Sequence, residues 1–152
     1  MEIYKSLVDR LENQHLTIVE LIEKLPSKRN IHDNIAHLTK YQLVFIERLK
    51  KILMGNSPYF ERYEAENDPD FEMFRKMNEN DLLKSLNQNR ELLNDLVVNL
   101  LEDDLIKTGV HKKFGELNIV QWLEFFVLHE AHHIFTIFQL ANDINLEAKN
   151  DK

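Results

Sequence analysis

Cysteine is absent from this chain of 152 residues. Disulfide bonds, catalytic thiolates and cysteine-based zinc sites are therefore excluded together. Any metal ion must be bound by histidine, aspartate or glutamate side chains. The length is typical of one domain, which buries about 70% of its surface on folding and can form a core without covalent cross-links.

Long apolar segments and an excess of positive charge are also missing. No apolar run approaches the roughly 18 residues of a membrane span, and the N-terminus is charged from Glu2 onward, unlike a secretory signal. We therefore expect a cytoplasmic protein that does not bind membranes. Acidic residues outnumber basic residues 26 to 19, giving a formal net charge of −7, which argues against nucleic-acid binding. The short basic segment ERLKK, Glu47 to Lys51, is interpreted as a solvated helix face.

Glycine and proline occur only three times each, and they lie at the boundaries of periodic segments, as is typical of a helical protein. Apolar residues recur at three- and four-residue steps in four segments: Ile3–Leu25, Ile31–Met54, an asparagine cap at Asn78 or Asn80 to about Leu100, and Ile119–Asn142 after a cap at Asn118. No segment predicts a convincing strand. We therefore predict an all-α four-helix bundle, with one domain at residues 1–145 and a polar tail at 146–152.

The two connections that flank the third predicted helix are irregular. Gly55–Met77 is rich in acidic and aromatic residues without a sustained period, and we expect a long crossover between the second and third helices, with one helical turn near Phe71–Met77. The second connection, LIKTGVHKKFGELN, contains Gly109, His111 and Gly115. Long connections are often functional, and His111 is a candidate for the mouth of a site.

The segment VLHEAHHIF, Val127 to Phe135, carries the densest chemistry of the chain. His129, Glu130 and His133 fit the zinc-protease pattern HExxH, and His132 is an additional histidine. On a helix, His129 and His133 project side by side and can bind one metal ion. At about 100° per residue, Glu130 is expected on a flank of that face.

Several interpretations of this segment are open. A zinc protease usually takes its third ligand from downstream, but the 19 residues after His133 contain no histidine, and no strand is predicted for a peptide substrate to pair with. The histidines can also simply fill a helical core. Two histidines four residues apart on an apolar face favour a metal site over core filling.

A third metal ligand is expected from another helix, because metal sites of bundles are built from side chains on facing helices. His37 is the best candidate, since it lies at the margin of the second apolar stripe, with Tyr41 one turn after it and Asp33 one turn before it. Three histidines without a carboxylate leave a coordination position open, as in catalytic sites. Imidazole suits zinc, nickel, copper and iron alike.

Arg90 interrupts the leucine stripe of the third predicted helix, where an apolar residue is expected. A guanidinium in or near the core needs an anion. We favour an internal partner such as Asp33 over a bound carboxylate. Arg90, His111, Tyr41 and Asp33 are therefore candidates for contacts to the substrate or to the metal ligands.

These residues together resemble the DinB-like (DinB/YfiT) superfamily of metal-binding four-helix bundles. The resemblance rests on IAHL followed by FIERLKKIL in the second helix, on the long crossover, and on GVHKKFGELNIVQWLEFFVLHEAHHIFTI. It implies that His37, His129 and His133 bind a divalent metal, usually zinc or nickel, with water completing the shell. Members with known activities include S-transferases that use bacillithiol or mycothiol. Many relatives carry glutamine where this chain has Thr136.

The resemblance implies a metal-dependent S-transferase that activates a small-molecule thiol of the bacillithiol type for attack on an electrophile. The alternatives are a non-catalytic metal-binding or stress-related bundle and a metal-dependent hydrolase with Glu130 or His132 as general base. The last helix is also apolar on the side away from the histidines, at Val120, Val127, Ile134 and Phe138. Such a helix must be covered on both sides, by the crossover or by a second subunit. Because relatives often form dimers, we expect a homodimer.

Overall fold

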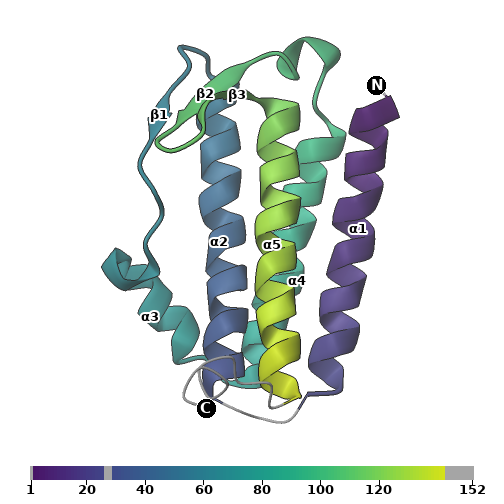
Figure 1. Cartoon of the computed structure of the whole chain (residues 1–152), viewed down its shortest axis with the longest axis vertical. Helices are drawn as coiled ribbons and strands as arrows, with labels where there is room; N and C mark the ends of the chain where they lie inside the picture. Colours follow the sequence, from purple (N-terminus) through teal and green to yellow (C-terminus); the bar gives the residue numbers. More distant parts are fainter. Residues whose placement is uncertain (1, 26–28, 143–152) are drawn as a thin grey trace, which may run out of the picture.

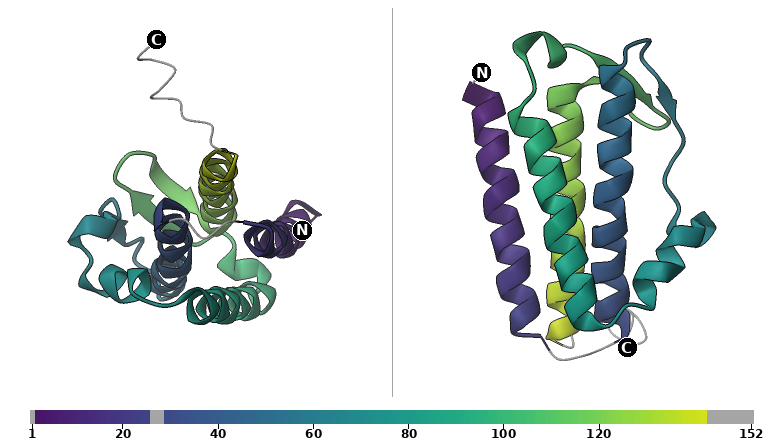
Figure 2. Two further views of the ribbon diagram at one scale, coloured as in Figure 1. Left: turned by 90° about the horizontal axis from the view of Figure 1, so that it is seen from below. Right: turned by 180° about the vertical axis from the view of Figure 1, so that it is seen from behind.

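The computed structural model describes residues 2–25 and 29–142, and four long helices form its main body (Figure 1). These helices are α1 (Glu2–Glu23), α2 (Arg29–Leu53), α4 (Glu79–Val98) and α5 (Ile119–Ala141). α1 and α2 each pack against both α4 and α5, as the end-on view shows (Figure 2). The prediction of a four-helix bundle is confirmed. The predicted tail at 146–152 lies outside the described residues.

Asparagine caps fix where two of the long helices begin. The side chain of Asn118 accepts a hydrogen bond from the backbone N–H of Gln121, and the Gln121 side chain accepts one from the backbone N–H of Asn118. Asn78 accepts from the N–H of Asp81 at the start of α4. Each cap satisfies backbone donors that have no partner within the first turn. None of the described helices has the length and apolar character that a membrane crossing requires.

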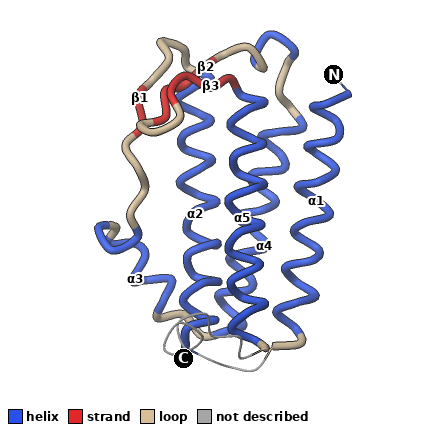
Figure 3. Tube along the Cα trace, in the orientation of Figure 1, coloured by secondary structure: helices blue, strands red, loops and turns tan. Residues whose placement is uncertain are grey.

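The prediction that the chain contains no strand is wrong. β1 (Tyr59–Phe60) pairs in parallel with β2 (Thr108–His111), which pairs antiparallel with β3 (Gly115–Asn118). The small sheet lies at one end of the bundle, next to the start of α5 (Figure 3). Strands of two to four residues are too short to produce a recognisable alternation of apolar and polar residues.

The crossover continues from β1 through a short 3-10 helix, η1 (Ala65–Asn67), to α3 (Pro69–Arg75). The predicted helical turn near Phe71–Met77 corresponds to α3, whose first turn contains Pro69 after a cap by Asp68, a position where proline is compatible with a helix. α3 packs on α2, on the side away from α1 (Figure 2). A second 3-10 helix, η2 (Glu102–Asp104), leads from α4 to β2.

The apolar core is divided into two clusters along the bundle axis. One contains Phe45 and Trp122 near the sheet, and the other contains Leu86 and Ile137 near the opposite end. Buried polar side chains lie at the boundary between the clusters, at Thr39, Gln42, Asn89, Arg90 and Glu130. We call this set the polar layer.

Gly109 on β2 is predicted to be required for the close packing of the sheet on α2. A Cβ at this position would lie 2.8 Å from Ile52 Cγ1 and 2.9 Å from Phe60 Cε2. Both side chains are buried, so Gly109→Ala should lower the free energy of unfolding by about 1–3 kcal/mol through overpacking. Urea denaturation measures this effect. Glu116→Ala, at an exposed position of β3, serves as the control, and equal stability of the two variants would contradict the prediction.

Candidate metal centre

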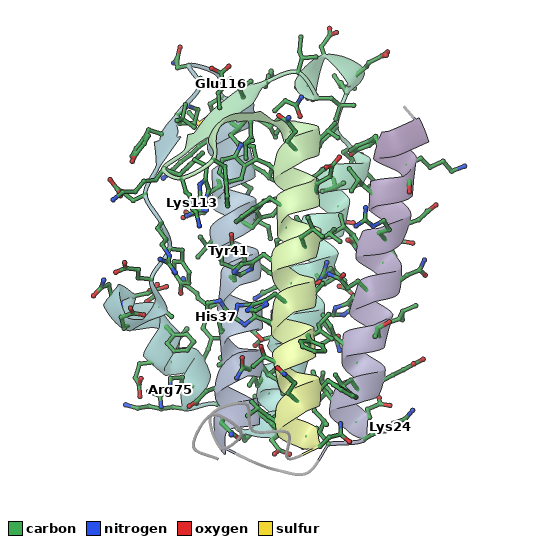
Figure 4. The ribbon with its side chains drawn as sticks, in the orientation of Figure 1. Lys24, His37, Tyr41, Arg75, Lys113 and Glu116 are labelled. Atoms are coloured by element: carbon green, nitrogen blue, oxygen red, sulfur yellow. The ribbon has the colours of Figure 1, made fainter. Side chains whose placement is uncertain are left out.

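The structure brings three histidines together between α2 and α5. One ring nitrogen from each of His37, His129 and His133 lies within 4.8 Å of the others. The ring centroid of His37 is 4.3 Å from that of His133 and 5.9 Å from that of His129. His129 and His133 lie on successive turns of α5, and α2 packs beside α5 and supplies His37 (Figure 4). Three nitrogen atoms at this separation can hold one metal ion.

Each of these histidines has a buried ring nitrogen without a hydrogen-bond partner among the described residues. The atoms are Nε2 of His37 and Nδ1 of His129 and His133. Such an atom ordinarily costs about 1–3 kcal/mol. Burial lowers the pKa of His129 to about 4 and that of His133 to about 3, and it also lowers the pKa of His37. The three imidazoles are therefore neutral at pH 7, with lone pairs available to a divalent cation. The residues present fit a metal ion of the kind that imidazole binds.

The three histidines form part of the wall of a cavity of about 810 Å³. The helical wall also contains Tyr41, Arg48 and Phe125, while residues 62–66 of the crossover and residues 111–114 of the β2–β3 turn complete the lining. Lys113 of this turn lines the same cavity as Tyr41 and His37, and all three are labelled in Figure 4. An ion bound by the histidines would therefore face space that a small molecule can occupy, as in open catalytic sites.

His111 lines this cavity but is not part of the three-histidine cluster. Its Nδ1 accepts hydrogen bonds from the backbone N–H groups of Lys113 and Phe114, at 3.0 and 3.1 Å. Its ring stacks on Phe114, with a centroid distance of 4.6 Å. His111 thus shapes the turn that covers the cavity.

Tyr41 packs directly against the cluster. Its ring centroid lies 4.3 Å from that of His129, and the residue is buried. Burial raises the pKa of the Tyr41 hydroxyl to about 12. The hydroxyl therefore keeps its proton at neutral pH and can act as a hydrogen-bond donor in the cavity wall.

Glu130 lies off the histidine face of α5, as helical spacing predicts, but its complete burial was not expected from the sequence. Only 1% of its surface is exposed, and its carboxylate pairs with Arg90 of α4 and accepts a hydrogen bond from Gln14 of α1 at 2.8 Å. Glu130 faces the interior of the bundle, where α1 and α4 cover it. Glu130 is not part of the cavity lining.

Arg90 has the internal partner that the sequence analysis expected, but the proposed identity of that partner, Asp33, is wrong. Asp33 instead pairs with Arg75 of α3, with 3.2 Å between Oδ1 and Nε. The reason is that α3 packs outside α2 and reaches Asp33 there, whereas Arg90 points into the polar layer. Asp33 does not line the cavity.

His132 is exposed on α5, and its ring centroid lies 5.8 Å from that of His133. It does not line the cavity either. The helical carbonyl of His132 accepts a hydrogen bond from Thr136 Oγ1 at 3.2 Å. Neither general base that the sequence suggested, Glu130 or His132, therefore faces the space beside the cluster.

Arg48 is a cavity residue that the sequence analysis missed. The interpretation of Glu47–Lys51 as a solvated face is wrong at this position, because only 7% of Arg48 is exposed and it lines the cavity. The available signal was its spacing: eleven residues after His37 correspond to about three helical turns, which puts the two residues on the same face of α2.

Comparisons with known proteins agree with the fold. A family model described as the DinB superfamily matches residues 5–137. Among solved structures, the chain is similar to YfiT from Bacillus subtilis, which is described as a probable metal-dependent hydrolase with an unusual four-helix bundle topology. The TM-score is 0.75 at 16% identity, over 93% of this chain and 87% of that chain. A comparison with curated proteins finds no significant match.

Replacing a clustered histidine should weaken binding of a divalent cation. We expect His37→Ala, His129→Ala and His133→Ala each to lower the affinity for Co²⁺. The decrease should exceed the roughly 10–100-fold loss that follows when a residue that only hydrogen-bonds to a metal ligand is replaced. The absorption spectrum of the protein titrated with Co²⁺ measures this change. His132→Ala is the matched control, since it removes an exposed histidine from the same helix. Wild-type affinity in His37→Ala would contradict the three-ligand arrangement.

Breaking the buried ion pair should be more costly than removing both partners. We expect Glu130→Leu or Arg90→Met alone to lower the free energy of unfolding by about 3–5 kcal/mol, because each leaves one buried charge uncompensated. The double variant should recover much of this loss. Urea denaturation of the complete double-mutant cycle measures the coupling, with exposed Glu124→Leu as the control on α5. Strictly additive losses would show that the two charges do not stabilise each other.

Proposed function

The chain belongs to the DinB superfamily, whose model matches residues 5–137, and from this premise we propose that it is a metal-dependent enzyme acting on a small-molecule thiol. The proposed metal, zinc or nickel, is held by His37, His129 and His133. The proposed reaction transfers the thiol sulfur to an electrophile, in the cytoplasm, where such thiols stay reduced. One observation carries the proposal: three neutral, partly buried imidazoles form part of the wall of a large cavity.

A bound divalent cation would supply positive charge that favours thiolate over thiol. A free thiol has a pKa of about 8.5 and bulk water one of about 15.7, so a much smaller shift suffices for the thiol. Among the described residues of the cavity lining, the only carboxylates are those of Glu64 and Glu66, both on the crossover. Because few bases lie beside the cluster, the site favours a thiol as nucleophile, since a thiol loses its proton more readily than water does.

The chain's own residues would orient the reactants and limit access of water. The rings of Tyr41 and Phe125 lie against His129, with centroid distances of 4.3 and 5.9 Å, and Phe114 continues the aromatic wall on the cover. The thiolate would attack the electrophilic carbon, forming a carbon–sulfur bond, and the leaving group would depart with the electron pair of the broken bond. The protonated Tyr41 hydroxyl can donate a hydrogen bond to such a group.

A hydrolase is the second candidate, because the structural neighbour YfiT is described as a probable metal-dependent hydrolase. The buried ion pair of Glu130 with Arg90 removes Glu130 as the general base. A hydrolase would instead rely on Glu66, which lines the cavity and whose charge opposes the lowering of the pKa of His37. A purely structural metal site is disfavoured, since such sites are closed to outside ligands.

The homodimer stays part of the proposal. Val127 is buried within the subunit, so it does not contribute to an outer face of α5. Exposed apolar residues do occur on this helix, at Leu128, Phe135 and Phe138. A second subunit would cover them.

The thiol proposal can be tested with the Co²⁺-substituted protein. We expect 2-mercaptoethanol to change the visible spectrum of bound Co²⁺ and ethylene glycol, its oxygen analogue, to leave it unchanged. Thiol consumption with 1-chloro-2,4-dinitrobenzene, in which chloride leaves, then measures transfer. Tyr41→Phe should lower the rate while preserving the thiol-induced spectrum. An unchanged spectrum with the thiol would rule out the proposal, and a changed spectrum without transfer would indicate a non-catalytic metal site.

A further inference from the structure

Arg48 places a buried positive charge in the wall of the cavity. It lies on α2, it is 93% buried, and it lines the same cavity as the three histidines. One of its nitrogens, Nη2, donates a hydrogen bond of 2.9 Å to the backbone carbonyl of Glu61. Within residues 2–25 and 29–142, no carboxylate forms an ion pair with it.

The surroundings of Arg48 lower the free-energy cost of burying its positive charge, but they do not neutralise that charge. The guanidinium carbon lies 5.5 Å from the ring centroid of Phe60 and 5.9 Å from that of Trp122, distances at which aromatic rings attract a cation. The ionisable groups that its charge influences are Tyr41, His111 and His129. All three are neutral at pH 7. A buried charge without a counter-ion is costly, so this position favours an anion from outside the chain.

Arg48 and the metal ligand His37 belong to one stripe of α2. Eleven residues separate them, which corresponds to about 16 Å along the helix axis at nearly the same angle. Both side chains line the same cavity. A ligand in the cavity can therefore reach the histidines with one end and Arg48 with the other.

In the rest of the lining, cationic side chains outnumber carboxylates three to two. Arg62, Lys112 and Lys113 accompany Arg48, against the two carboxylates of the lining, Glu64 and Glu66, in a chain whose formal net charge is −7. Lys112 is exposed and pairs with Glu61 at 2.9 Å, and Lys113 is exposed beside Phe114. Exposed charges are screened by solvent, which leaves Arg48 as the buried anchor.

We propose that Arg48 binds a carboxylate of the substrate whose thiol reaches His37, His129 and His133. The inference rests on the proposed function and narrows it: the preferred thiol carries an acidic group several bonds from its sulfur. The guanidinium still has donors beyond the one that contacts Glu61, and its planar fork suits the two oxygens of a carboxylate.

Calorimetric titration of the zinc-loaded protein with a matched pair of thiols tests this subsite. 6-Mercaptohexanoate and 6-mercaptohexanol have the same thiol and chain but differ at the far end. We expect the acid to bind at least about tenfold more tightly to the wild type, as a charge-assisted hydrogen bond in a buried site allows. Titrations with shorter and longer mercapto acids then identify the distance between thiol and carboxylate that gives the tightest binding.

Arg48→Gln should abolish the preference for the acid while the protein still binds zinc. Lys51→Gln removes a charge from an exposed position of the same helix, outside the cavity lining, and should keep the preference. Arg48→Lys retains the positive charge but lacks the planar guanidinium, and it should reduce the preference for the acid. This variant provides a test if Arg48→Gln does not fold.

The outcomes separate the two proposals. Equal binding of acid and alcohol by the wild type would overturn the Arg48 subsite and leave the thiol proposal standing. An acid preference that persists unchanged in both Arg48 variants would overturn the assignment to Arg48. Binding of neither thiol would overturn the proposed function, and the subsite with it.

Discussion

The ion pair between Arg90 and Glu130 is the interaction on which the geometry of the three-histidine cluster depends. Both side chains are 99% buried, and they join α4 to α5 in the polar layer. Apolar clusters tolerate small shifts of a helix, whereas a buried charge that loses its partner is strongly destabilising. Because Glu130 follows His129 directly, holding Glu130 toward α4 turns His129, about 100° away, toward α2. One pair thus fixes the rotation of α5 about its axis and the direction of His129 and His133.

The sequence was sufficient for the features that repeat or that act locally. Apolar periodicity located the four long helices, and Asn78 and Asn118 marked where two of them begin. His129 and His133 were recognisable because a spacing of four residues determines their relative direction on any helix. His37 followed from the requirement for a facing helix. Apart from the assignment of His37, each of these inferences needs only one element and its own geometry.

The features that the sequence did not reveal depend on what covers each element. Helical spacing predicted the direction of Glu130 relative to His129. It did not predict that α1 and α4 bury the Glu130 side chain. Arg48 was read as solvated because its neighbours in ERLKK are charged, although the crossover and the sheet cover it. β1 pairs with β2 across about fifty residues of sequence, and two residues of strand carry no period. Asp33 pairs with Arg75 of α3, a helix of seven residues.

The division of the cavity between rigid walls and an irregular cover has a consequence for how such proteins diverge. The three histidines and Arg48 stand on long helices whose packing depends on the core, while residues 62–66 and 111–114 belong to connections that tolerate insertion and replacement. Changes in these connections can alter which molecules fit without disturbing the metal ligands. A protein with this architecture can therefore acquire new substrates by exchanging loops, while the helical fold itself is similar even at the 16% identity seen with YfiT.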